Sequence, residues 1–495
     1  MRVFSIKYHR LLALFGGIAL LLWGGSGLLH PIMTNFGPQP AVFYPPSQPV
    51  DLTGIHPIHD TLQDARITEA SAVKVVATEG RNILQVTTRP TEPRRYFELL
   101  GGEEVPGYDE SHAEFLARHY TQASEPIRST EWVTDFTDEY PWVNRLLPVY
   151  KVTFDRPDNL SIYVYTETNA SAGMGDNFKD ALQAGFRWIH TWSWFPREAD
   201  WARVVLMALL VGSLFALGVT GVGMLLFIKR KVRAPGSRGW HRLAGYVLAL
   251  PILGYSASGL FHLLTYAAVP PVASLQLSEP INVAGAVFPI GEQWQELSEG
   301  LDVSGVSIIE DRNGRVLYRL GLAMPRGNGP QTASEIRNAR FEGVERTGPA
   351  VYLDAATGDV VPEGDRELAL QLGETFTGAD RGAIEAASLV TRFGPDYDFR
   401  NKRLPVWRLD YGSPVNATIF VDTTTGVLVD EVPNASKAER LSFSVVHKLG
   451  FLRALGRKGP DLAAVILISL SLIFLAVLGL QMDLKRRARK RRSRK

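Results

Sequence analysis

The sequence predicts an α+β membrane protein in which four transmembrane helices and two external domains form two parallel helix–domain–helix repeats. Three observations predict this fold class: four long apolar runs, basic residues gathered at one end of each run, and a duplicated segment with histidines at both ends. The 495-residue chain has 10 histidines and no cysteine. Without cysteine, disulfides, iron–sulfur clusters, thiolate zinc sites and covalent haem attachment are excluded. Any metal or cofactor must therefore be held by histidine, carboxylate or backbone.

The four apolar runs are long enough to cross a hydrocarbon core of about 30 Å at about 1.5 Å per helical residue. They cover residues 11–33, 204–228, 243–268 and 462–482. The first run follows a basic start, as in a cleaved signal peptide, but residues 24–31 offer no cleavage site of the usual small-residue kind. We therefore expect the first run to be retained as a helix.

Basic residues gather at one end of these runs. Three precede the first run, six lie between the second and third, and nine follow the fourth, against the single acid Asp483. These ends carry a charge of +17, so the rest of the chain carries −15 within a total of +2. By the positive-inside rule, both termini and the short middle loop are cytoplasmic, and the two long segments are external.

This topology predicts the order of domains along the chain. We expect a first transmembrane helix (1–34), an external domain ending in an interfacial helix (35–198), a second transmembrane helix (199–230), a cytoplasmic loop (231–239), a third transmembrane helix (240–268), a second external domain (269–440), an interfacial helix (441–460), a fourth transmembrane helix (461–483) and a basic cytoplasmic tail (484–495).

An internal repeat carries most of the histidines. Residues 8–30 and 240–262 align without a gap, with an H-R-L start and an S-G-L-x-H end in the same register. The chemically informative pairs are His9/His241, Arg10/Arg242, Ser26/Ser258, Gly27/Gly259 and His30/His262. Weaker counterparts, FRWIH at 186–190 and FSVVH at 443–447, predict short amphipathic helices at the outer surface. Both halves have the same orientation, which implies a pseudo-two-fold axis along the membrane normal.

The spacing of the two histidines within each repeat indicates where they lie on a membrane-spanning helix. His9 and His30, like His241 and His262, are 21 residues apart, which is about 31 Å and about 60° around an α-helix. Each helix therefore presents one histidine at each membrane edge, on one face. Two imidazoles from facing helices can supply both axial ligands of a b-type haem, one haem near each surface.

Neighbouring residues support a haem site. Arg10 and Arg242 lie beside the inner histidines, where a haem propionate needs a cation. Residues 16–17 and 24–25 are paired glycines, which would let a flat macrocycle approach the helix closely.

Other interpretations of the histidines remain open. Histidine also binds copper, zinc and non-haem iron, so metal transport is a competing function, although the spans lack the Met, Asp and Glu that such a pathway usually adds.

His190 and His447 have four open roles: ligating the outer haem in place of His30 and His262, binding a further haem, contacting substrate, or lying as surface histidines among interfacial tryptophans. His112 and His119 fall on one helical face, which we expect to be solvated.

The two long segments contain strand–turn–strand units. In the second segment two strands end in D-x-x-T-G, at 354–358 and 422–426, where the Asp caps the turn and Gly takes positive φ. The first segment has the same rhythm at 150–154 and 160–166, but Thr166-Glu167-Thr168-Asn169 replaces the motif. The first half has therefore diverged at this turn.

With these units, four spans and histidines at the span edges, the chain resembles the PepSY-associated transmembrane family, in particular its iron-regulated ferric-siderophore reductases. The resemblance covers essentially the whole chain. It implies two PepSY-like periplasmic domains, haem b in the bacterial inner membrane, and electron delivery from the cytoplasmic side to a ferric siderophore or other chelate, with release of Fe(II). It assigns His9 and His241 to an inner haem and His30 and His262 to an outer haem.

The expected partners follow from what the chain lacks. No G-x-G-x-x-G opens a helix after a strand and no P-loop occurs, so a flavin or NAD(P)H reductase or quinol must supply electrons. The basic tail serves to anchor the topology or to dock an acidic reductase or anionic lipid. No nucleic-acid partner is expected. The alternative function is a membrane-anchored PepSY module that binds peptides or proteins, or senses them, without redox activity.

Overall fold

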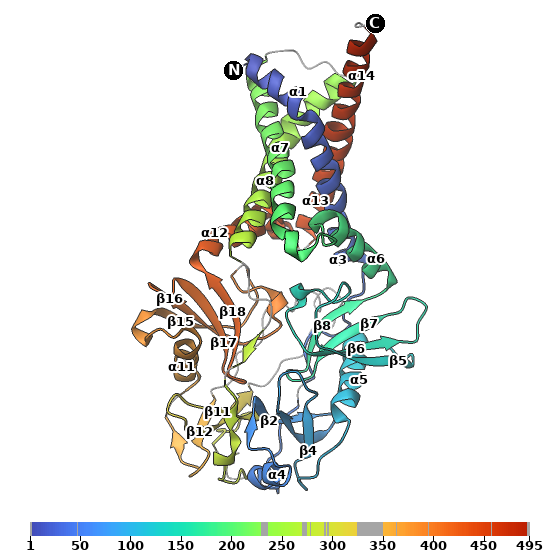
Figure 1. Cartoon of the computed structure of the whole chain (residues 1–495). Helices are drawn as coiled ribbons and strands as arrows, with labels where there is room; N and C mark the ends of the chain where they lie inside the picture. The colour runs from blue at the N-terminus through green and yellow to red at the C-terminus, as the bar shows by residue number, and fades with distance from the viewer. Residues whose placement is uncertain are drawn as a thin grey trace. The chain divides into compact units, whose positions relative to one another are not determined.

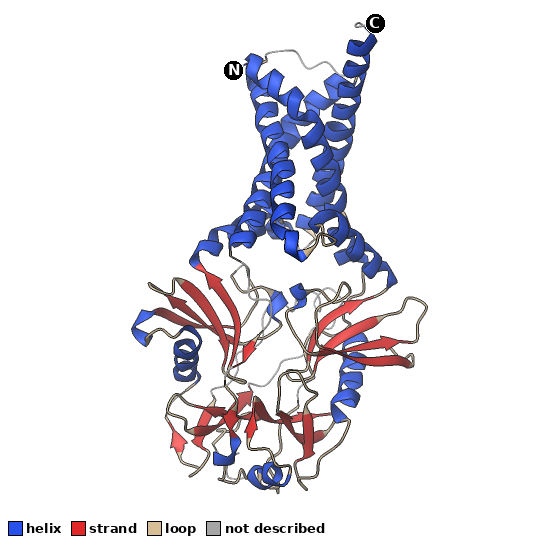
Figure 2. Ribbon diagram, in the orientation of Figure 1, coloured by secondary structure: helices blue, strands red, loops and turns tan. Residues whose placement is uncertain are grey.

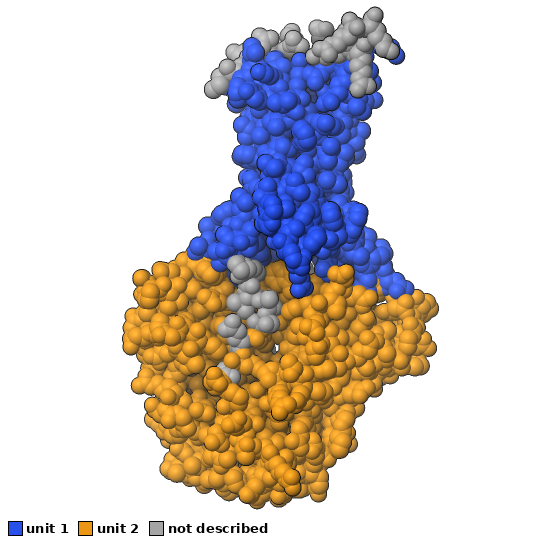
Figure 3. Space-filling view, in the orientation of Figure 1, with its two compact units in different colours: residues 1–37, 177–271, 435–495 blue, residues 38–176, 272–434 orange. Residues whose placement is uncertain are grey.

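The computed structural model describes the chain except residues 1, 47, 229–235, 270–274, 278, 292–293, 295–296, 324–349, 363, 395, 457 and 493–495. The predicted loop at 231–239 and the tail end at 493–495 thus lie wholly or partly outside the described residues. The chain is mixed α+β and divides into two compact units (Figure 3). The helical unit contains residues 1–37, 177–271 and 435–495, and the sheet unit contains residues 38–176 and 272–434.

Among the described residues, the helical unit contains four helices that are long and apolar enough to cross a membrane, as predicted (Figures 1 and 2). The first, Val3–Phe36, is built from α1 (Arg2–Ala19), η1 (Leu20–Gly24), α2 (Gly25–Gly27) and α3 (Leu29–Phe36). The second comprises η4 (Arg197–Ala199) and α7 (Asp200–Phe227), and the third is α8 (Ser237–Ala268). The fourth comprises α13 (Gly459–Ser471), η10 (Leu472–Val477) and α14 (Leu478–Arg492), so helix continues into the basic tail.

Two shorter helices occupy the places where amphipathic helices are predicted. They are α6 (Asn177–Phe186) with η3 (Arg187–Thr191), and α12 (Asn434–Ser442) with η8 (Phe443–His447), which is followed by η9 (Gly450–Leu455). Both η3 and η8 are π-helical turns, and each ends on or next to a candidate histidine. Because π-helical turns are rare and frequent at functional sites, their occurrence at equivalent places directs attention to His190 and His447.

Three of the four paired glycines of the first helix pack against other helices. A Cβ on Gly16 would lie 2.8 Å from a methyl carbon of Leu217 on α7, and one on Gly17 would lie 3.1 Å from Leu480 on α14. Gly24 likewise faces Leu472 of η10, whereas a Cβ on Gly25 would meet no atom of the described residues within 4 Å. Gly16, Gly17 and Gly24 therefore allow close helix–helix approach, and the expectation that the paired glycines bring a cofactor close to the helix stays a prediction.

The sheet unit contains three larger sheets and one small strand pair (Figure 2). Its strands are β1 (Glu69–Ala70), β2 (Ala72–Thr78), β3 (Arg81–Thr87), β4 (Arg95–Glu98), β5 (Ile127–Val133), β6 (Val149–Phe154), β7 (Ser161–Tyr165), β8 (Ala170–Gly175), β9 (Gln276–Leu277), β10 (Ile281–Asn282), β11 (Asp302–Glu310), β12 (Val316–Ala323), β13 (Val351–Asp354), β14 (Val360–Val361), β15 (Ile384–Val390), β16 (Val406–Tyr411), β17 (Ala417–Asp422) and β18 (Val427–Pro433). Its helices are α4 (Ile58–Asp64), α5 (Tyr108–Thr121), η2 (Trp142–Asn144), η5 (Val283–Gly285), α11 (Asp365–Thr377), η6 (Arg381–Ala383) and η7 (Phe399–Asn401).

Both long segments that are predicted to be external contribute strands to one sheet. The seven-stranded order is β14-β13-β12-β11-β2-β3-β4, and β2 pairs antiparallel with β11, with Val75 opposite Val306. This pairing satisfies two strand edges that would otherwise be open. The remaining strands form one sheet in each half, β5-β6-β7-β8 and β15-β16-β17-β18-β9. The two segments thus fold together as one unit rather than as two separate bodies.

A second internal repeat underlies these two smaller sheets. Residues 136–169 align without a gap to residues 393–426, at an offset of 257 that also relates His190 to His447. The Tyr140 hydroxyl donates to the Leu146 carbonyl, and the equivalent Tyr397 donates to the Arg403 carbonyl. Asn169 takes the place of Gly426, and both have positive φ, 55° and 64°. The turn is therefore kept in the first half, where Asn tolerates the left-handed conformation that Gly supplies in the second.

Buried ion pairs join the two halves of the sheet unit. Arg403 lies 3.1 Å from Glu167 of the other half and 2.6 Å from Asp422 of its own half. Arg145 reaches Asp430 of the second half at 3.2 Å. Burial raises the pKa of the Glu167 carboxyl, but the charges of Arg403, Lys74 and Arg94 outweigh it and hold this pKa at about 2.

Candidate functional site

The inner histidines of the repeat lie ring to ring. His9 on α1 and His241 on α8 have ring centroids 6.4 Å apart and ring planes 70° from parallel. The His9 Nδ1 lies 3.2 Å from the Leu217 carbonyl of α7, and the His241 Nδ1 lies 3.0 Å from the Phe474 carbonyl of η10. Because a carbonyl only accepts, each Nδ1 carries the proton, which leaves the Nε2 lone pair of each ring free to bind a metal.

Each inner ring lies against a glycine of a neighbouring helix. A Cβ on Gly221 would be 3.4 Å from the His9 Cε1, and a Cβ on Gly479 would be 3.3 Å from the His241 Cε1. A larger side chain at either position would push the ring away. The two glycines thus form matching cradles that set the position of both rings.

The separation of the inner rings matches that of two imidazoles on one metal. A metal–imidazole bond of about 2 Å, with the ring centroid about 1 Å behind the nitrogen, gives a centroid separation of about 6 Å. The measured value is 6.4 Å. The donor set, its tautomers and its spacing therefore fit the axial ligation of one haem iron.

The outer histidines form a second, larger group. His190 stacks on Phe186 at 4.5 Å, and its repeat equivalent His447 stacks on Phe443 at 4.7 Å. The His30 ring lies 6.0 Å from Phe186 and is tilted by 57°, whereas the His262 ring stacks on Phe443 at 4.1 Å. The structure thus brings the four outer candidates into two His–Phe–His groups that differ in the position of His30 and His262.

His190 and His447 each lie near a glycine, as the inner histidines do. Their Cε1 atoms would lie 4.0 Å and 3.4 Å from Cβ atoms on Gly27 and Gly259 respectively, so each ring again rests near a glycine. Burial lowers the pKa of His190 to about 3, helped by the nearby His447, His30 and His262, and burial lowers the pKa of His447 to about 4. Both rings are neutral at pH 7, which is the form that binds a metal.

His30 and His262 are placed differently. His30 is exposed on the protein surface, and the His262 side chain is 30% exposed. The His262 Nδ1 lies 2.6 Å from a carboxylate oxygen of Glu439, which is buried. The predicted assignment of His30 and His262 to the outer haem stays a prediction, while the neighbouring His190 and His447 have the environment that resembles the inner pair.

The two arginines of the repeat do not share one arrangement. Arg10 is exposed, whereas Arg242 is partly buried and its guanidinium donates to the Ile228 carbonyl and to the Tyr246 hydroxyl. The Arg242 Nε is buried without a hydrogen-bond partner among the described residues. Both arginines flank the inner histidines in sequence, and their role towards a propionate remains a prediction.

Some histidines of the sheet unit correct the sequence-based expectation. His112 on α5 is buried rather than solvated, and its ring nitrogens lie 3.1 Å from Glu79 and 2.8 Å from Asn169. The His119 Nε2 lies 2.9 Å from the Tyr44 carbonyl. Within the described part of the chain, no group of three or more His, Asp or Glu side chains is arranged to hold a bare metal ion.

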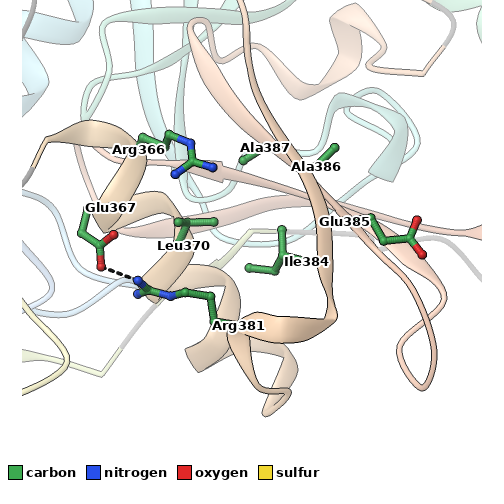
Figure 4. Close-up of a pocket in the computed structure, with 8 residues that line it drawn as sticks. All are labelled: Arg366, Glu367, Leu370, Arg381, Ile384, Glu385, Ala386 and Ala387. Atoms are coloured by element: carbon green, nitrogen blue, oxygen red, sulfur yellow. Dashed lines mark ion pairs between the residues drawn. The ribbon is translucent and has the colours of Figure 1, made fainter.

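The sheet unit also has a small pocket between α11 and the edge strand β15 (Figure 4). It has a volume of about 260 Å³, and Arg366, Leu370 and Ile384 lie along it. Arg381 in its wall pairs with Glu367 at 2.7 Å. No histidine lines this pocket, so it is separate from the histidine site.

The comparisons with known proteins give no further guide. No family model matches this chain, and no curated protein matches it.

Proposed function

We propose that this chain is a membrane-spanning b-type haem protein that carries electrons outward across the bacterial inner membrane and reduces a ferric chelate in the periplasm. The observation that carries this proposal is the inner histidine pair. His9 and His241 face each other at 6.4 Å with their Nδ1 atoms held by carbonyls, so both Nε2 atoms are available to one metal.

The membrane placement rests on the four apolar helices and on charge. Each helix is long enough to span a bilayer, and the flanking basic residues lie at one end of each. The positive-inside rule then puts His9 and His241 at the cytoplasmic edge. The π turns with His190 and His447 lie at the periplasmic edge, which gives one site near each surface.

For the outer site, the geometry favours His190 and His447 as the ligands. Both are partly buried, both stack on an equivalent phenylalanine, and both lie near an equivalent glycine. Ligation of the outer haem in place of His30 and His262 is one of the roles that the sequence leaves open for His190 and His447. His30 and His262 then lie next to the outer site, near Phe186 and Phe443 respectively.

The chemistry of such sites suits electron transfer. A haem with both axial positions filled by histidine exchanges single electrons and has no open position for oxygen. The chain's own carbonyls, from Leu217 and Phe474, fix the tautomers of the inner pair and orient its rings. A flavin or NAD(P)H reductase or quinol would supply electrons on the cytoplasmic side, because the sequence has no nucleotide-binding fingerprint.

Reduction frees iron from such a chelate. Siderophores hold Fe(III) through hard oxygen donors, and Fe(II) is a softer ion that such donors bind less strongly. One electron delivered at the periplasmic edge therefore releases the metal and leaves the chelator intact. Under the proposal, the iron chelate is the substrate, and the lipid bilayer is the medium that separates donor from acceptor.

An absorbance measurement tests the proposal. Purified full-length protein is expected to contain non-covalent haem, with a Soret band and α-bands that sharpen on reduction by dithionite. Mixing the reduced protein with a ferric hydroxamate and an Fe(II) indicator should reoxidise the haem and colour the indicator. Protein that carries no haem after expression with added haem precursor would overturn the proposal and favour the redox-inactive PepSY-like binding module.

A further inference from the structure

The hydrogen-bond partners of His190 and His447 differ, although the two histidines are equivalent by repeat. The Ser26 hydroxyl donates to the Leu22 carbonyl at 2.6 Å and lies 2.9 Å from the His190 Nδ1. A hydroxyl has one hydrogen, which Ser26 gives to Leu22, so its oxygen must accept from the His190 Nδ1–H. This bond fixes the proton on Nδ1 and leaves the Nε2 lone pair of His190 free.

The second repeat lacks this bond. Ser258 occupies the place of Ser26, but its hydroxyl donates to the Ser442 carbonyl at 3.3 Å and accepts from the Ser442 hydroxyl at 3.2 Å. The His447 Nδ1 is buried and has no partner of good geometry among the residues that the structure describes, although the Tyr255 backbone is near. Ser258 is thus engaged elsewhere.

One position explains the difference. At the repeat offset of 257, Ser442 corresponds to Gly185, which has no hydroxyl to compete for Ser26. A Cβ on Gly185 would meet only Leu29, at an ordinary 3.5 Å. The first repeat therefore has space for a serine side chain at position 185. Because glycine stands there instead, Ser26 is free to bind His190.

We propose that Ser26 is a positioning residue that holds His190 as the Nδ1–H tautomer and strengthens its Nε2 as a metal ligand, while Ser442 withholds the equivalent bond from His447. This inference rests on the proposed function, with His190 and His447 as the outer pair. A ligating histidine normally donates its other N–H to an outer partner, which raises the basicity of the ligand. The outer site therefore has one ligand with a hydroxyl partner and one without.

This asymmetry sets the reduction potential of the outer site. A more basic imidazole favours Fe(III), so the Ser26 bond lowers the potential and its loss raises it. Loss of an outer partner typically lowers metal affinity or activity by about 10–100-fold, and we take the lower figure, about tenfold, as the expected change in the preference for Fe(III) over Fe(II). A tenfold change in the Fe(III)/Fe(II) equilibrium of a one-electron couple is about 59 mV.

The test uses full-length protein and serine variants matched by the repeat. Ser26→Ala should raise the midpoint potential of one haem by about 59 mV, a tenfold change in its equilibrium, and leave the other haem unchanged. Ser258→Ala, the matched control, should change neither potential. Ser442→Gly should release Ser258 to bind His447 and lower the potential of the same haem that Ser26→Ala raises.

A second readout does not depend on electron transfer. In protein labelled with ¹⁵N-histidine, the His190 signals, identified with His190→Gln, should show a protonated Nδ1 and an unprotonated Nε2. Ser26→Ala should shift these signals towards a tautomer mixture, and Ser258→Ala should not. Unshifted signals and potentials in haem-loaded Ser26→Ala would overturn the inference and leave the proposed function standing. Protein without any haem would overturn both.

Discussion

At the scale of single residues, two glycines fix the inner histidine pair. Gly221 and Gly479 each leave room for one ring. Gly221 follows Leu217 on α7, and the Leu217 carbonyl accepts from His9. Gly479 follows Phe474 in the fourth long helix, and the Phe474 carbonyl accepts from His241. The contact and the hydrogen bond therefore come from the same helical segment. A side chain at the glycine would move the ring, and the ring would then lose the carbonyl hydrogen bond that fixes its tautomer.

Replacing Gly221 with valine should remove the inner haem. The new Cβ would lie 3.4 Å from the His9 Cε1, and the valine methyl groups would reach further into the ring. Haem per protein, measured by the pyridine haemochrome method, should fall by about half, because one of two sites is lost.

Gly212→Val on the same helix is the matched control, because a Cβ at Gly212 has no neighbour within 4 Å. Both variants place a β-branched residue inside α7, so their effects on helix propensity are equal. Equal haem content in Gly221→Val, Gly212→Val and unmodified protein would contradict the proposed role of the glycine cradle.

At the scale of elements, the long apolar helices were predictable and the π turns were not. Hydropathy and basic flanks predict the four spans, because a bilayer demands about 20 apolar residues in a row. The first long helix, however, contains the π turn η1, and the fourth contains η10. A π turn uses more residues than an α turn, so it rotates every later side chain relative to earlier ones.

This rotation limits what the 21-residue spacing could predict. The estimate that His9 and His30 share a helical face assumes regular α geometry throughout, and η1 lies between them. The third helix, α8, has no such π turn between His241 and His262. The inner pairing was accessible from the repeat, while the environment of the outer histidines depends on π turns that no periodicity in the sequence reveals.

The repeat at an offset of 257 residues is the sequence feature from which more of the site could have been predicted. It aligns Phe186 with Phe443 and His190 with His447, and it shows Gly185 opposite Ser442. The stronger H-R-L repeat relates only the first and third spans. Hydrogen bonds such as that between Ser26 and His190 depend on side-chain geometry, so the sequence alone could not predict them.

At the scale of the whole molecule, buried charges join the two halves of the sheet unit. Glu167 accepts from Arg403 of the other half, and its own carbonyl accepts from Lys74. Each of these three side chains is almost completely buried. The sequence showed the diverged turn at 166–169 but not that its glutamate pairs with the second half, because the partners are 236 residues apart.

Replacing Glu167 with glutamine should destabilise the sheet unit. Removing one member of a buried ion pair leaves the other charge uncompensated, at a cost of about 3–5 kcal/mol. Hydrogen–deuterium exchange of the full chain should report faster exchange at β7 and β17, while the exposed control Glu385→Gln should leave both strands protected. Unchanged protection in Glu167→Gln would contradict a joining role for this pair.

The same ion pair predicts an acid limit for the sheet unit. The pKa of Glu167 falls from 4.5 to about 2 on folding, since Arg403, Lys74 and Arg94 outweigh the cost of burial. Its contribution to stability is therefore present above pH 4.5 and is lost as the pH falls towards 2. The difference in thermal stability between unmodified protein and Glu167→Gln should shrink over this range, and a constant difference would refute the assignment.

The absence of cysteine makes the membrane topology directly testable. Single cysteines at the exposed positions Glu385 and Arg238 can be probed in spheroplasts with a membrane-impermeant maleimide. By the charge distribution, Glu385→Cys should react in intact spheroplasts, and Arg238→Cys should react only after lysis. Labelling of Arg238→Cys in intact spheroplasts would reverse the proposed orientation.

The central claim is that His9 with His241, and His190 with His447, each hold one haem. Haem stoichiometry of the purified full-length protein, measured for four histidine variants under one protocol, tests it most directly. The account predicts two haems per chain in unmodified protein, one each in His9→Ala and His190→Ala, and two in His30→Ala. The control His59→Ala, at a histidine on α4 of the sheet unit, should also retain two haems. One haem in His30→Ala together with two in His190→Ala would contradict the outer pairing, and two haems in His9→Ala would contradict the inner pairing.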